Sequence, residues 1–239
     1  MNTQKKMRNP ITQIKIPKFK DYPEEFSKIY NINIVKKIDD FKEFNSKEFY
    51  GYGQEYRNTC LIACLRSVLY NDFNIKFSHE YDLINLITDI DRVKARIAGK
   101  NYNYEKNNIK KQGAYLKHVK NIADFFRIGA FSSNNTNIKE LKNVLDIGIT
   151  PIVFRTMNEK DIDGHYIVVY SYENEIINFF DPAYRGKRPK DNFPHKGTYK
   201  KETSDEFISK LTNQYFDGGY IFLYHKKERP KIKLKGTYL

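Results

Sequence analysis

The spacing of apolar positions along the chain changes near its middle. Between residues 60 and 126, apolar residues recur every three or four positions, which is the period of an α-helix with one buried face. This spacing predicts helices that begin at Cys60 and at Ser78, and a third helix over residues 114–126. The polar residues 99–113 predict a loop before that third helix. The first half of the domain is therefore expected to be helical.

Runs of β-branched and aromatic residues dominate the second half, and such runs are typical of strands. They cover residues 151–154, 165–172, 175–180 and 220–225. Glu173 and Asn174, between the second and third runs, fit a hairpin turn. Short helices are predicted over residues 137–145 and 203–211. A helical half followed by an antiparallel sheet predicts an α+β domain of two layers, with the functional site between them.

The two ends of the chain differ from the body between them. We predict an N-terminal extension over residues 1–48 with a short helix at 24–37, a domain over 49–226, and a C-terminal tail over 227–239. The formal net charge is +13, and residues 1–20 carry six basic residues and no acidic one. The tail is also strongly basic. Basic ends either keep a protein in solution or hold an acidic partner or an anionic surface.

Composition excludes several classes of protein. A hydrophobic content of 40%, with 19 Tyr and 17 Phe, is typical of a globular chain. No segment reaches the roughly 18 consecutive apolar residues of a membrane span, and the polar N-terminus lacks the apolar core of a secretory signal peptide. We therefore expect a cytoplasmic protein, or one exported by a route that needs no such signal. No zinc-finger, RNA-recognition or helix-turn-helix signature points to nucleic acid.

The only two cysteines stand four residues apart at the start of a predicted helix. This spacing is poor for a disulfide, and without a nearby histidine pair it falls short of a zinc signature, so neither a metal nor another cofactor is expected. Cys60 would occupy the helix N-terminus, where unpaired N–H groups favour a thiolate. Cys64, one turn later on the apolar face, is expected to be inert packing.

Three further residues can complete a thiol-nucleophile site with Cys60. His165 opens a predicted central strand, Asp181 ends the next one, and Gln54 stands six residues before the cysteine. A histidine can act as general base, a carboxylate can orient it, and a side-chain amide can donate to an oxyanion. Taken singly, each residue also has an ordinary structural interpretation: a strand-edge histidine, a turn aspartate and a loop glutamine. Together they favour catalysis.

The combination resembles the papain-like superfamily and, within it, the bacteriocin-processing peptidases that cleave double-glycine leaders. The resemblance covers roughly residues 50–225 and rests on Gln54, the helix start around Cys60, Gly164-His165-Tyr166, and Asp181-Pro182. It implies a papain-like fold with the nucleophile helix packed on an antiparallel sheet. It also implies that Cys60 is nucleophile, His165 general base, Asp181 its orienting group and Gln54 oxyanion donor.

Leu61 and Gly164 flank the nucleophile and the base, and we expect them to contact substrate. Leu61 replaces the glycine that usually follows the nucleophile in that family, which would narrow the space around the thiol. The expected activity is hydrolysis of a peptide or isopeptide bond through an acyl-enzyme. Glutamine deamidation or acyl transfer by a bacterial effector or toxin would use the same residues. A non-catalytic module that binds through its basic surfaces, including residues 185–190, is the remaining alternative.

Overall fold

The computed structural model describes residues 32–34, 49–134, 137–156, 164–183, 197–213, 216–228, 230 and 236–239. The helices are α2 (Cys60–Phe73), α3 (Glu80–Ile97), α4 (Ile109–Gln112), α5 (Leu116–Phe126), α6 (Ile138–Asp146) and α7 (Ser204–Ser209), with a 3-10 turn at Lys226–Glu228. The strands are β1 (Ile32–Ile34), β2 (Ile75–Phe77), β3 (Gly129–Ser133), β4 (Ile152–Thr156), β5 (Gly164–Glu173), β6 (Ile176–Asp181), β7 (Thr198–Thr203), β8 (Thr212–Asn213), β9 (Phe216–Asp217), β10 (Gly219–Tyr224) and β11 (Thr237–Tyr238).

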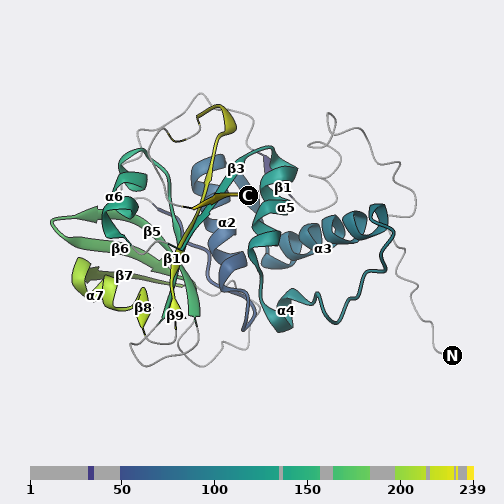
Figure 1. Ribbon diagram of the computed structural model, residues 1–239, viewed down its shortest axis with the longest axis horizontal. Coiled ribbons are helices and arrows are strands. Elements are labelled where there is room, and N and C mark those ends of the chain that lie inside the picture. The colour runs from purple at the N-terminus through teal and green to yellow at the C-terminus, as the bar shows by residue number, and fades with distance from the viewer. Residues whose placement is uncertain are drawn as a thin grey trace.

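A seven-stranded sheet in the order β11-β3-β10-β4-β5-β6-β7 forms the centre of the molecule, and every neighbouring pair in it is antiparallel. The predicted strands at 151–154, 165–172, 175–180 and 220–225 correspond to β4, β5, β6 and β10. The expected mixture of helices with an antiparallel sheet is therefore confirmed. Figure 1 shows the sheet on one side of α2, with α3 and α5 on the other.

Apolar residues on both faces of the sheet explain why its central strands are continuous apolar runs. On β5, Val168 packs with the helices α2, α3 and α5, whereas Ile167 and Val169 pack on the opposite face. That opposite face is covered by α6 and α7, through residues such as Leu141 and Phe207. The expected two layers are thus three, because the short amphipathic helices of the second half cover the far face of the sheet (Figure 1).

The β5–β6 hairpin has a two-residue turn that lies close to the predicted one. Its loop is Asn174-Glu175, and both residues have positive φ values of 46° and 62°. Two central residues with positive φ match a turn whose twist suits a two-residue hairpin, and asparagine tolerates this conformation well. The turn is therefore one residue later than predicted, and it fixes the pairing of β5 with β6.

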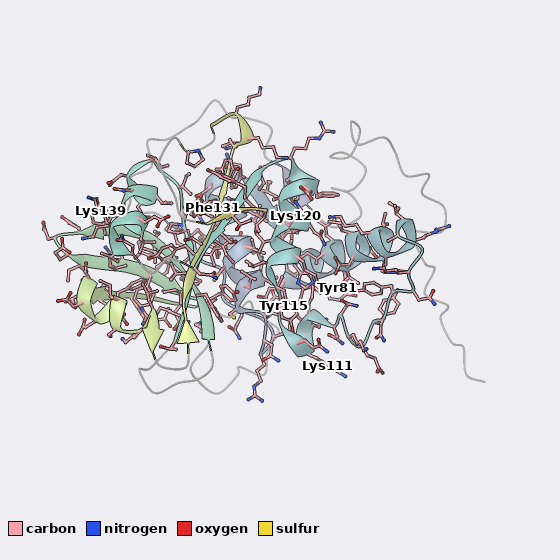
Figure 2. The ribbon with its side chains drawn as sticks, in the orientation of Figure 1. Tyr81, Lys111, Tyr115, Lys120, Phe131 and Lys139 are labelled. Atoms are coloured by element: carbon pink, nitrogen blue, oxygen red, sulfur yellow. The ribbon has the colours of Figure 1, made fainter. Side chains whose placement is uncertain are left out.

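Two terminal segments join the fold through short strands. Residues 32–34, inside the predicted helix 24–37, instead form β1 and pair with β2, while the rest of that predicted helix lies outside the described residues. Within the predicted tail, Thr237–Tyr238 pairs with β3, and Tyr238 lies edge-on to Phe131, which is labelled in Figure 2. Neither strand could be predicted, because two or three residues cannot establish an alternating pattern.

Candidate functional site

Cys60 is the first residue of α2, and the helix N-terminus is left open beside it. Thr59 is the N-cap residue, but its side chain makes no capping hydrogen bond to the helix. The first N–H groups of α2 are therefore uncapped by a side chain, and their partial positive charge lies next to the Cys60 thiol. Cys60 is partly exposed and Cys64 is fully buried, as the sequence predicted. Burial, followed by the negative charges of Cys60, Asp181 and Glu80, raises the pKa of Cys64.

His165 and Asp181 come together from the adjacent strands β5 and β6. The pairing of Val168 with Phe180 places both side chains on the same face of the sheet, and His165 Nε2 lies 2.8 Å from Asp181 Oδ1. The carboxylate is fully buried, whereas the imidazole side chain is 13% exposed. Because Nε2 faces Asp181, Nδ1 is the imidazole nitrogen left for another partner.

That other partner is the Cys60 thiol, which forms a side-chain hydrogen bond with the His165 ring. Burial alone would lower the pKa of His165, but side-chain hydrogen bonds with Asp181 and Cys60 raise it to about 9. A protonated imidazole at neutral pH is thus flanked by a thiol and a carboxylate. Three of the four predicted catalytic residues, namely Cys60, His165 and Asp181, are brought into one chain of contacts.

Asp181 has more partners than the sequence indicated. Besides its contact with His165, Oδ1 accepts a hydrogen bond from the backbone N–H of Ala183 at 2.9 Å. Its Oδ2 accepts a hydrogen bond from the Lys200 ammonium at 2.5 Å. Burial opposes ionisation of Asp181, but the hydrogen bond and charge of His165, followed by Lys200 and Ala183, hold its pKa well below the usual range. Lys200 belongs to β7, a polar strand that sequence analysis did not predict.

Gln54 lies in the loop that joins these elements, and its side-chain amide is occupied. The Gln54 backbone N–H donates to the Pro182 carbonyl at 2.9 Å, which ties the loop before Cys60 to the segment after Asp181. Its Nε2 donates to the carbonyls of Tyr56 and Arg57, each at 2.9 Å. Both amide hydrogens thereby hold the loop, so the predicted role as oxyanion donor stays a prediction.

The two predicted substrate contacts differ in their exposure. Leu61 is 1% exposed and packs in the core between α2 and the sheet, so its side chain does not reach the surface of the site as expected. The reason is that Leu61 lies on the face of α2 that packs with Val168 and Phe180 of the sheet, whereas Cys60 beside it is partly exposed. Gly164 is partly exposed, begins β5 and pairs with Thr156.

A second buried carboxylic acid lies near the start of α2, beside Thr59. Glu80 is fully buried, and its Oε2 accepts the Thr59 hydroxyl and the Glu55 backbone N–H, both at 2.7 Å. Its Oε1 is buried without a hydrogen-bond partner in the described part of the chain. Burial raises the pKa of Glu80 to about 8, so this acid is mainly protonated at neutral pH. Sequence analysis predicted a helix start at Ser78 and gave Glu80 no role, whereas α3 begins at Glu80 with His79 as its N-cap.

Arg66 supports the same region from the middle of α2. It is 1% exposed, and its guanidinium pairs with Glu55 at 2.9 Å and donates to the carbonyls of Phe77 and Ser78. The Tyr52 ring lies beneath it at 4.1 Å. Arg66 thus links the loop before Cys60 to the start of α3, which holds that loop in place from behind.

Comparison with models of protein families and with curated protein sequences finds no match to this chain. Within the described residues, no group of three or more His, Cys, Asp or Glu side chains is arranged to hold a metal ion. None of the described helices combines the length and the apolar character needed to cross a membrane.

Proposed function

We propose that this chain is a cysteine-dependent hydrolase of papain-like type that cleaves a peptide or isopeptide bond. The observation that carries the proposal is the continuous contact Asp181–His165–Cys60, with the thiol at an uncapped helix N-terminus. A thiol, a base and an orienting carboxylate in this order are the parts of an activated nucleophile.

In the acylation step, the Cys60 sulfur attacks the carbonyl carbon of the substrate and a C–S bond forms. His165, protonated on Nδ1, then gives its proton to the leaving amine as the C–N bond breaks, which leaves a thioester on Cys60. Asp181 fixes the ring orientation through Nε2 and balances the imidazolium charge. The raised pKa of His165 keeps this proton available at neutral pH.

The negative charge on the carbonyl oxygen needs donors near the thiol. Backbone N–H groups in the first turn of α2 supply them, because no side chain caps that turn. The Gln54 amide would add a second donor only if one of its two bonds to the loop were released. In the second step, water gives a proton to His165 and its oxygen attacks the thioester; the C–S bond breaks, which releases the acid and restores the Cys60 thiolate beside a protonated His165.

The test is the rate at which iodoacetamide alkylates each cysteine, measured by peptide mass spectrometry over a range of pH. We expect fast labelling of Cys60 near pH 6, where an ordinary thiol with a pKa of about 8.5 is almost wholly protonated. Buried Cys64 should label slowly in the same sample. His165→Ala should abolish the fast labelling at acidic pH.

Slow labelling of both cysteines, with no effect of His165→Ala, would contradict the proposal and leave the non-catalytic alternative. If Cys60 is activated, incubation with candidate polypeptides distinguishes the reactions. A new C-terminus identifies a protease, and conversion of a glutamine to a glutamate identifies a deamidase. Cys60→Ala is the control for both products.

A further inference from the structure

We propose that Lys200 is a positioning residue of this site: its ammonium group fixes the Asp181 carboxylate so that His165 keeps its ring orientation and its proton. The inference rests on the proposed function, because it concerns how the Cys60–His165 pair is maintained. It adds a fourth member to the chain of contacts, which becomes Lys200–Asp181–His165–Cys60.

Strand pairing explains why Lys200, rather than a neighbouring lysine, reaches the carboxylate. In the β6–β7 pair, Asp181 is opposite Thr198 and Phe179 is opposite Lys200. Because side chains alternate along a strand, Lys200 and Asp181 project from the same face of the sheet, and so does His165 on β5. Lys201 is opposite Asn178 and projects from the other face.

Burial distinguishes this ion pair from the surface pairs of the molecule. Asp181 is fully buried, and its Oδ2 has Lys200 as its partner in the described residues. By contrast, Lys142 pairs with Glu175, whose side chain is 75% exposed. An exposed pair contributes little, whereas removing one partner of a buried charge leaves a charge without compensation.

The charged and titratable groups that face Asp181 in the described residues come from three elements. They are His165 on β5, Lys200 on β7 and, on α2, the Cys64 thiol, which senses the Asp181 charge. Of these, Lys200 is the cation that is independent of the proposed proton transfer. Without it, the carboxylate would lose one hydrogen bond and a fixed positive charge, so it would bind a proton at higher pH. Protonation of Asp181 would then deprive the imidazolium of its counter-ion.

The experiment compares the pH dependence of Cys60 alkylation in the wild type and in Lys200→Met, Lys200→Arg and Lys201→Met, with the thermal midpoint recorded for each. For Lys200→Met we expect the pH below which Cys60 labelling slows to rise by about one unit. Labelling in that acidic range should then be about tenfold slower than in the wild type. Lys200→Arg keeps the charge and donors and should restore most of the rate. Lys201→Met removes a lysine from the opposite face and should match the wild type.

Superimposable profiles for Lys200→Met and the wild type would overturn the inference, and so would equal losses in Lys200→Met and Lys200→Arg. Failure of the proposed function is a different result, because it appears as slow labelling of Cys60 in the wild type itself. In that case, an NMR titration of the His165 ring still tests Lys200. Protonation of Asp181 should change the chemical shift of the His165 ring at acidic pH. The pH of that change should be higher in Lys200→Met than in the wild type and unchanged in Lys201→Met.

Discussion

Asp181 and Glu80 are both fully buried carboxylic acids beside the start of α2, yet they are expected to differ in protonation at neutral pH. Asp181 accepts from the His165 imidazole, the Lys200 ammonium and a backbone N–H. Glu80 accepts from a hydroxyl and a backbone N–H, and one of its oxygens lacks a partner in the described residues. Burial raises the pKa of both acids, so the cationic partners decide which one is ionised.

The contrast shows how one helix start can have a charged side and a neutral side. On the sheet side, Asp181 supplies the negative charge that keeps His165 protonated. On the side of α3, a neutral Glu80 accepts the Thr59 hydroxyl next to Cys60 without adding a second full charge. A second carboxylate there would compete for the imidazolium and oppose formation of a thiolate.

Asp181→Asn is the variant expected to have the largest effect on this contrast. The substitution keeps the size of the side chain but removes its charge, so His165 loses its counter-ion and Lys200 is left unpaired. We expect Cys60 alkylation near pH 6 to be about a hundredfold slower, which is a change of about two pKa units in the ion pair. The rate is measured by peptide mass spectrometry, and a rate close to that of the wild type would show that the charge of Asp181 is not needed.

Glu80→Gln tests the neutral side through stability rather than reactivity. Glu80 has a pKa of about 8 in the folded protein against 4.5 as the ordinary value, so the unfolded chain binds fewer protons between these limits. The contribution of Glu80 to the free energy of unfolding should therefore be greatest below pH 4.5, fall by up to about 5 kcal/mol as the pH rises to 8, and then become level. Urea titrations across this window should show a flatter dependence in Glu80→Gln, with nearly unchanged Cys60 labelling.

Asp72 provides the control for that prediction. Burial also raises its pKa, to about 7, although Thr150 donates to it with both its hydroxyl and its N–H. Asp72→Asn should therefore remove a separate part of the same fall in stability. The pKa of Asp181 is lowered rather than raised in the folded protein, so its effect on stability runs the other way. Its contribution to the free energy of unfolding is present above about pH 3.8 and is lost only in stronger acid. A dependence unchanged by Glu80→Gln would mean that Glu80 is ionised in the folded protein.

Cys64→Ala should have the smallest effect. The Cys64 thiol is fully buried and senses the charges of both Asp181 and Glu80, but it forms no part of the proposed contact chain. We expect a loss of roughly 1 kcal/mol in the free energy of unfolding, from a small buried group. Cys60 labelling should be unchanged. If Cys64→Ala abolishes fast labelling while the thermal midpoint is unaltered, the choice of Cys60 as the reactive thiol is wrong.

The sequence predicted the parts of the fold that have strong local patterns. The apolar runs of β5 and β6 and the helical spacing after Cys60 placed the Cys60, His165 and Asp181 side chains on elements that do meet. Glu80 and Lys200 were missed because a single polar residue in a helix turn or in an exposed strand normally faces solvent. β7 reads Thr-Tyr-Lys-Lys-Glu-Thr and has no apolar alternation to identify it as a strand.

Side-chain direction accounts for the remaining differences. Leu61 was expected to face the substrate, but its side chain packs in the core while the neighbouring Cys60 is partly exposed, and this difference within one turn could not be read from the sequence. The Gln54 amide turns back to the carbonyls of its own loop. That direction depends on the conformation of the loop, which no periodic pattern specifies.

The order of strands in the central sheet has a consequence for synthesis on the ribosome. β3 and β4 do not pair with each other, because β10 lies between them, and β10 is made after every other strand except β11. A nascent chain that has emerged only as far as α7 therefore has β3 without a partner in the described sheet and β4 with one edge open. Contacts that are distant in sequence form slowly, and open edges attract other chains. Arrival of β10 is thus the step that closes the gap in the sheet and protects the growing protein from aggregation.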